Sequence, residues 1–115
     1  MGATNFDTLQ VGRFKSAREA YRNAVEEANY EYGHDSYNGT ISTTSGFRMI
    51  DVPGRKDPFR YVDDIDKWDD WGISKWEACG CIEIKGTRLK KLKERNGYKG
   101  KKGIRAFYFF GWAAC

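Results

Sequence analysis

The chain has 115 residues, a formal net charge of +4 and 40% hydrophobic residues. A chain of this length can bury one packed core and is too short to hold separate catalytic and regulatory modules. An aromatic content of 16% excludes an intrinsically disordered chain, and 31% charged residues with a mean hydropathy of −0.75 indicate a well-solvated exterior. No apolar run approaches the roughly 20 residues that span a bilayer and no signal-peptide pattern opens the chain, so we expect residues 1–115 to form a single soluble domain in the cytoplasm.

The first half of the chain predicts an edge strand, a helix and a hairpin. Residues 6–11 could add an edge strand. Ser16-Ala17-Arg18-Glu19 has the capping-box pattern, and apolar residues then recur every three or four positions, which predicts a helix over 16–32 that Gly33 ends. β-branched residues at 40–44 and alternation at 47–52 predict two strands joined by a turn at Thr44-Ser45-Gly46.

The second half predicts two short helices and two strands. After a loop over 53–58, apolar residues at three-residue intervals predict a helix over 63–71, which Gly72 ends. A period of two over 76–85 predicts a half-buried strand. Thr87 is placed to cap a brief basic helix that Asn96-Gly97 ends, and 103–113 predicts a long final strand. The fold class is therefore α+β, with the N-terminal helix packed on a small, mainly antiparallel sheet with two short helices.

Positive charge is concentrated in one segment of the chain. Ten of the 20 Lys and Arg residues fall between Lys85 and Arg105, where only Glu94 opposes them. The segment from Asp57 to Asp70 carries six aspartates against two bases. This asymmetry could steer the chain to an anionic partner, or the two blocks could pair within one molecule or between the subunits of a homo-oligomer.

A glycine-lysine segment is the strongest candidate for anion binding. Gly97-Tyr98-Lys99-Gly100-Lys101-Lys102-Gly103 places three glycines at intervals of three among basic residues, so that backbone amides and ammonium groups could converge on a phosphate. KH domains clamp a nucleic-acid backbone with a GxxG loop, although the KH helix context is missing here. Arg88, Lys91 and Arg95 share one side of the preceding helix. The candidate binding residues are Arg88, Lys91, Arg95, Tyr98, Lys99, Lys101 and Lys102; a flexible connection with solvated lysines is the alternative.

The aromatic residues near the C-terminus allow two interpretations. Tyr98, Phe107, Tyr108, Phe109 and Trp112 could stack on bases, as aromatic residues do in single-strand binders. Alternation places Tyr108, Phe110 and Trp112 on one face of the strand and Phe107 and Phe109 on the other. Because both faces are aromatic, we favour packing in the core, and we predict that Phe110 and Trp112 are buried.

No residue pattern predicts an active site or a metal site. Cys79-Gly80-Cys81, Cys115 and His34 are soft ligands without the paired spacing of zinc sites, and three cysteines fit a reducing compartment. The aspartates of 63–70 lack the alternation of an EF-hand loop. His34-Asp35-Ser36 are consecutive residues, which seldom converge as a triad. We therefore predict a chain that is not an enzyme and that has no cofactor.

One order of residues is similar to that of an enzyme family. Ser42-Thr43-Thr44, preceded by Arg18 or Arg22 and followed by Glu77 or Glu83, is similar in order to the Arg, Ser-Thr-Ser, Glu series of ADP-ribosyltransferases. The paired Glu-x-Glu of that family is missing from this chain.

Three pieces of the chain resemble small proteins from tailed-phage genomes. They are 17–21 leading to Tyr32-Gly33-His34-Asp35, then Tyr37-Asn38-Gly39-Thr40-Ile41-Ser42-Thr43, and Phe109-Phe110-Gly111-Trp112-Ala113. The resemblance implies a viral origin more firmly than an activity, and no catalytic residues can be carried over from it. Small accessory phage proteins often inhibit host defence stoichiometrically, as anti-CRISPR proteins do, which implies a host defence protein or ribonucleoprotein complex in the host cytoplasm as the partner. A non-enzymatic nucleic-acid-binding module and a protein that sequesters a nucleotide signal are the alternatives.

Overall fold

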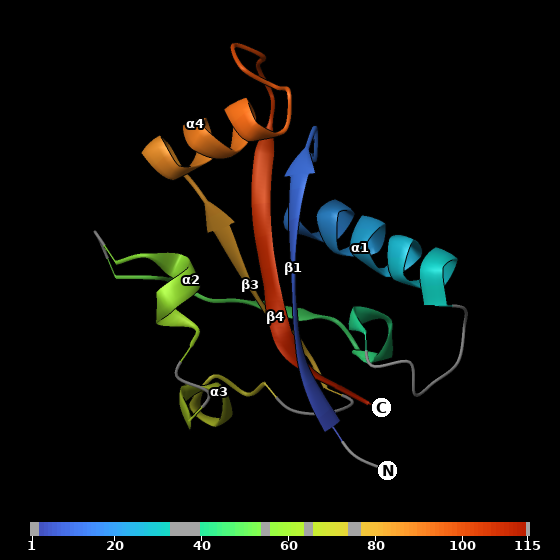
Figure 1. The fold of residues 1–115 in the computed structure, drawn as a ribbon. Helices are drawn as coiled ribbons and strands as arrows, with labels where there is room; N and C mark the ends of the chain where they lie inside the picture. The colour runs from blue at the N-terminus through green and yellow to red at the C-terminus, as the bar shows by residue number, and fades with distance from the viewer. Residues whose placement is uncertain (1–2, 33–39, 54–55, 64–65, 74–76, 115) are drawn as a thin grey trace.

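A computed structural model describes residues 3–32, 40–53, 56–63, 66–73 and 77–114. Four strands form one sheet in the order β1-β4-β3-β2 (Figure 1). In chain order the elements are β1 (Ala3–Gly12), α1 (Ala17–Tyr32), the 3-10 helix η1 (Ile41–Thr43), β2 (Phe47–Met49), α2 (Pro58–Tyr61), α3 (Asp66–Asp70), β3 (Cys79–Ile84), α4 (Gly86–Arg95) and β4 (Arg105–Ala114). None of the helices in these ranges has both the length and the apolar character needed to cross a membrane.

The long final strand β4 lies at the centre of the sheet. It pairs antiparallel with β1 over ten residues, from Ala3 opposite Ala114 to Gly12 opposite Arg105, and antiparallel with β3 on its other side. Strand β2 adds to β3 in parallel. The predicted α+β class and mainly antiparallel sheet are confirmed, and so is the edge position of the first strand.

The predicted hairpin over 40–52 is wrong. Residues 41–43 form η1, because the hydroxyl of Thr40 accepts a hydrogen bond from the Ser42 amide at 3.3 Å and the Thr44 amide donates to the Ile41 carbonyl at 3.0 Å. Short hydroxyl side chains satisfy nearby backbone groups in this way and so compete with strand pairing. Strand β2 pairs instead with Cys79–Cys81 of β3, more than 30 residues along the chain.

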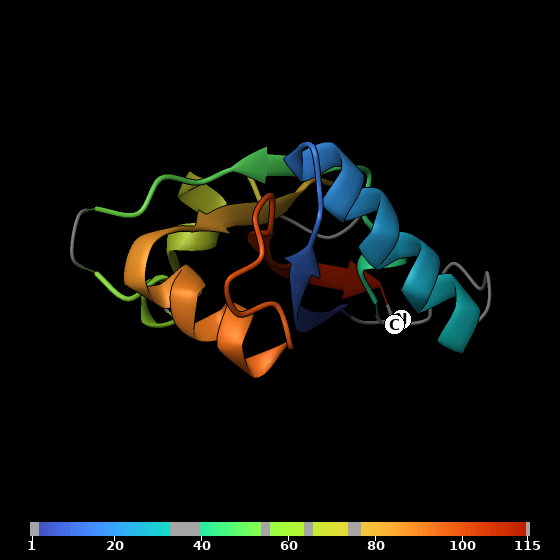
Figure 2. The ribbon, with the colours of Figure 1, turned by 90° about the horizontal axis from the view of Figure 1, so that it is seen from above.

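Helices cover both faces of the sheet. Figure 2 shows α1 on one side of the strands and α4 on the other. The core between α1 and the sheet is formed by the buried side chains of Ala20, Ala24, Ala28, Ile41, Cys79, Cys81, Phe107 and Phe109. The core on the other face, between the sheet and α2, α3 and α4, is formed by the buried side chains of Val62, Trp68, Ile73, Ile82, Ile84, Leu92, Ala106, Tyr108 and Phe110. Because β3 is packed on both faces, the prediction that it is half-buried is wrong, although its alternation is confirmed.

The helix starts follow capping chemistry more closely than apolar periodicity. The Ser16 half of the predicted capping box of α1 is confirmed, since the Glu19 amide donates to Ser16 Oγ at 3.3 Å. Among the described residues the Glu19 carboxylate accepts no hydrogen bond from the Ser16 amide, and Gly33 lies outside those residues. Helix α2 was not predicted: Asp57 accepts from the Phe59 amide at 2.9 Å, and Pro58 suits the first helical position, where no amide donor is needed.

Two other helix boundaries differ from the prediction. Helix α3 spans Asp66–Asp70, a shorter segment than the predicted 63–71, with Gly72 at a φ of +74° after it. Helix α4 begins at Gly86 with Lys85 in the capping position and no side-chain cap, so the predicted capping role of Thr87 is wrong. Its predicted end at Asn96-Gly97 is confirmed.

Candidate anion-binding surface

Helix α4 presents its basic residues to solvent because its apolar residues face the sheet. Leu92 is buried and Leu89 is half-buried against the core beneath α4. The candidate residues Arg88, Lys91 and Arg95 are all exposed. The spacing of three and four residues places them along one side of the helix, as the sequence predicts.

The segment after α4 folds back against the helix. The Tyr98 amide donates to the Lys93 carbonyl at 2.8 Å, and Gly97 has a φ of +79°, which together form the Schellman ending of a helix. Asn96 adds two hydrogen bonds to the Leu92 carbonyl, from its amide at 3.0 Å and from its Nδ2 at 2.7 Å. A further turn follows, in which the Lys101 amide donates to the Tyr98 carbonyl at 2.9 Å. The glycine-lysine segment is therefore a hydrogen-bonded turn rather than a loose connection.

The fold gathers cations from the helix and the turn around one hollow. Lys90, Lys93 and Lys99, with Glu94 and Gly100, line a hollow of about 360 Å³. Lys90 and Lys93 were not among the predicted binding residues. Lys99 lies beside them only because the turn folds back against α4, and the sequence does not show that turn. Of the predicted residues, Lys99, Lys101 and Lys102 are exposed and Tyr98 is half-buried.

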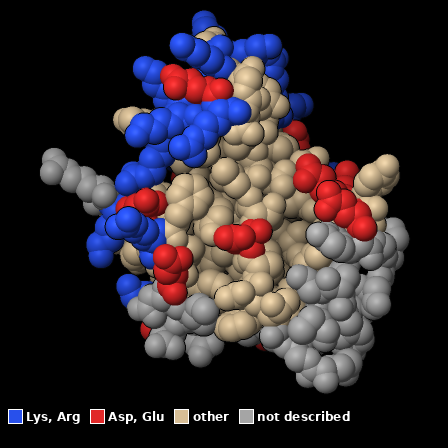
Figure 3. Space-filling model, in the orientation of Figure 1, with Lys and Arg blue, Asp and Glu red and all other residues tan. Residues whose placement is uncertain are grey.

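We call this region the basic surface and define it by the eight cations of α4 and the turn: Arg88, Lys90, Lys91, Lys93, Arg95, Lys99, Lys101 and Lys102. Figure 3 shows Lys and Arg atoms crowded at the end of the molecule that α4 and the turn occupy, whereas Asp and Glu are scattered over the rest of this face. Eight cations with one opposing acid, Glu94, create a positive potential that attracts polyanions.

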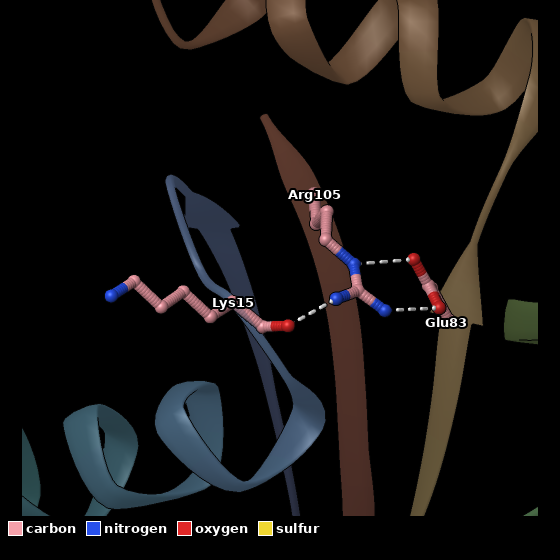
Figure 4. Close-up of polar contacts among 3 residues, drawn as sticks. All are labelled: Lys15, Glu83 and Arg105. Carbon is pink, nitrogen blue, oxygen red and sulfur yellow. Dashed lines mark hydrogen bonds and ion pairs between the residues drawn. The ribbon is translucent and has the colours of Figure 1, made fainter. Parts of the chain in front are cut away.

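Arg105 belongs to the fold rather than to the basic surface. Its Nε and Nη2 donate to the two carboxylate oxygens of Glu83 at 2.9 and 3.0 Å, and its Nη1 donates to the Lys15 carbonyl at 2.7 Å (Figure 4). The hydrogen bonds from Arg105 lower the pKa of Glu83, against the effect of burial. This is the one ion pair among the described side chains, so Asp57, Asp63 and Asp70 form none with the basic surface.

The aromatic residues of β4 are not available to stack on bases. Phe107, Phe109 and Phe110 are fully buried and Tyr108 is 8% exposed, which confirms the prediction of core packing. Trp112 is half-buried and packs edge-on against Trp68, so its predicted burial is only partial. Of the residues named as candidates for stacking, only Tyr98 and Trp112 are half-buried rather than buried, and Tyr98 is the one that lies on the turn after α4.

The buried thiols are poor metal ligands. Cys79 and Cys81 both lie under α1, and burial raises the pKa of Cys79 to about 12 and that of Cys81 as well. A thiol must lose its proton to bind zinc, which such a pKa opposes. The described residues contain no cluster of three or more groups able to hold a metal. His34-Asp35-Ser36, Tyr37-Asn38-Gly39 and Cys115 lie outside the described residues.

Only some of the residues that match the ADP-ribosyltransferase order lie together in the structure. Arg18, Arg22 and Ser42 line one hollow, but Ser42 belongs to η1 rather than to the predicted strand. Glu83 is bound to Arg105.

No family model, no curated protein and no solved structure matches this chain.

Proposed function

We propose that this chain acts by stoichiometric binding, and that its basic surface engages phosphate groups of nucleic acid exposed by a host defence ribonucleoprotein complex. The observation that carries the proposal is the basic surface itself: eight cations on one helix and one hydrogen-bonded turn, with Glu94 as the one acid among them. Protein cations that neutralise phosphates release condensed counterions, which makes such binding favourable and independent of base sequence.

The hydrogen-bonded turn supports phosphate binding over solvation alone. Backbone hydrogen bonds fix the turn that carries Lys99 against the end of α4, and Lys90, Lys93 and Lys99 line one hollow. A backbone segment that is already in place loses less conformational entropy on binding than a free segment does. The resemblance to phage accessory proteins supplies the biological setting, an inhibitor working in the host cytoplasm.

The first test is equilibrium binding of a labelled single-stranded RNA and a labelled DNA duplex at low salt. We expect the triple variant Lys91→Gln/Lys99→Gln/Lys101→Gln to bind at least about tenfold more weakly than the natural chain, since every phosphate contact contributes to the same electrostatic attraction. The matched control is Lys56→Gln/Arg60→Gln/Lys67→Gln, which removes the same charge from exposed residues in and beside α2 and α3. Equal weakening by both triple variants would contradict a localised site.

The second test separates an inhibitor from a general nucleic-acid binder. We expect expression of the chain to raise the plating efficiency of a phage that a CRISPR–Cas host otherwise restricts, and the Lys91→Gln/Lys99→Gln/Lys101→Gln variant to lose this protection. Binding to nucleic acid without any protection would instead favour the general nucleic-acid-binding module.

A further inference from the structure

A second hollow lies on the opposite side of the sheet from the basic surface. It is formed where α1 packs beside η1 and the residues that follow it, and its volume is about 530 Å³. Arg18, Arg22 and Val25 of α1 line one side, and Ser42, Thr44 and Ser45 line the other. Figure 2 shows α1 and α4 on different faces of the strands, so this hollow is separate from the basic surface.

The two arginines are placed to act on one ligand. Arg18 and Arg22 are four residues apart on α1, so their side chains project from the same side of the helix, about one turn apart. Both are exposed, and within the described ranges neither guanidinium makes an ion pair or a hydrogen bond. Two adjacent guanidinium groups present planar sets of N–H donors, the geometry that binds phosphate in a bidentate manner.

The wall opposite the arginines is fixed by hydrogen bonds. The Tyr21 hydroxyl lies 2.6 Å from Thr44 Oγ1, and Thr44 Oγ1 donates to the Ile41 carbonyl at 2.7 Å, so Tyr21 is the donor in the first pair. The Ser45 amide donates to the Glu77 carbonyl at 3.2 Å. The Ser45 side chain is exposed and, among the described residues, its hydroxyl makes no hydrogen bond, which leaves it able to donate into the hollow.

We propose that this hollow binds a small molecule carrying a phosphate monoester, with Arg18, Arg22 and the Ser45 hydroxyl on the phosphate. A volume of about 530 Å³ exceeds what a phosphate needs and lies in the range of small-molecule sites. Val25 and the Tyr21 ring offer apolar contact to the organic group. Glu26, one turn beyond Arg22, is a carboxylate that repels the phosphate and accepts hydrogen bonds from hydroxyl groups, so it orients a sugar phosphate with its sugar away from the arginines.

The test is calorimetric titration of the full chain with four probes: inorganic phosphate, ribose 5-phosphate, AMP and unphosphorylated ribose. We expect binding of ribose 5-phosphate and AMP and none of ribose. Arg18→Gln and Arg22→Gln should each weaken that binding by about tenfold or more, because each removes a charge-assisted hydrogen bond. Tighter binding of AMP than of ribose 5-phosphate would identify a nucleotide as the ligand class, and equal binding would identify a sugar phosphate.

Two controls keep this site apart from the basic surface. Arg60→Gln removes one exposed arginine from α2 and should leave the titration unchanged. Lys99→Gln/Lys101→Gln/Lys102→Gln alters only the basic surface and should also leave it unchanged, whatever it does to nucleic-acid binding. Failure of ribose 5-phosphate and AMP to bind the natural chain, or unchanged binding by a folded Arg18→Gln/Arg22→Gln variant, would overturn the proposal.

Discussion

Arg105 ties together three parts of the chain that are distant in sequence. From the first residue of β4 it reaches the Glu83 carboxylate on β3 and the carbonyl of Lys15, just before α1, and it also lies 5.0 Å from the centre of the Phe107 ring. We expect Glu83→Gln to lower the free energy of unfolding at neutral pH by about 1 kcal/mol, because a bidentate pair at a partly exposed position contributes about that much.

The contribution of this pair depends on pH in a defined direction. The pKa of Glu83 is lower in the folded chain than its usual value of 4.5, so the unfolded chain takes up the proton first as pH falls. The stabilisation is therefore fully present above about pH 4.5 and is lost as pH falls through the folded-state pKa. Urea unfolding of the natural chain and Glu83→Gln should give stabilities that converge in acid, and a constant difference down to low pH would contradict this assignment.

Gly80 is required by the ring that lies across it. Gly80 is directly opposite Phe110 in the sheet, and a Cβ at position 80 would lie 2.3 Å from Phe110 Cζ. The ring is buried and packs against Trp68 and Trp71. We expect Gly80→Ala to lower the free energy of unfolding by about 3 kcal/mol, as overpacking of a core does.

A double variant isolates the cause of that loss. Phe110→Leu shortens the side chain opposite Gly80, so in that background Gly80→Ala should lower the free energy of unfolding much less. Thermal or urea unfolding of the four proteins measures this coupling. Strictly additive costs would show that the alanine disturbs something other than the Phe110 ring.

The end of α4 is the element on which the basic surface depends. Its Schellman ending needs a left-handed residue, and Gly97 supplies it with a φ of +79°. We expect Gly97→Ala to lower the free energy of unfolding by about 1 kcal/mol, because a Cβ disfavours this conformation. Glu94→Ala, in the last turn of the same helix, is the strain-free control for urea unfolding. Equal stability of Gly97→Ala and the natural chain would mean that the turn tolerates another conformation.

The elements could be predicted where local chemistry decided them. Ser16 with Glu19 marks the start of α1, and Asn96-Gly97 marks the end of α4, because capping and backbone freedom act within a few residues. The pairing of β2 with β3 could not be predicted, since the partners are more than 30 residues apart and β-branched residues at 40–44 suit a strand as well as a 3-10 turn.

At the scale of the whole molecule, the fold separates charge from aromatic packing. The aromatic residues of β4 fill the core on both faces, while the neighbouring cations stay on α4 and its turn. The seven candidate residues were predicted from the charge block and its glycine spacing, and the structure places them on α4 and the turn after it. Lys90 and Lys93 could not be predicted in the same way, since only the folded turn brings Lys99 to them. The hollow beside Arg18 and Arg22 likewise depends on tertiary packing.

The most direct test of phosphate binding by the basic surface is the salt dependence of nucleic-acid affinity. The slope of log K against log salt counts the phosphates that are neutralised, and each lysine removed from a phosphate contact lowers it by about 1. Measured on one DNA duplex, Lys99→Gln/Lys101→Gln/Lys102→Gln should reduce the slope of the natural chain by about 3. An unchanged slope in this variant, or no binding by the natural chain at low salt, would contradict the account.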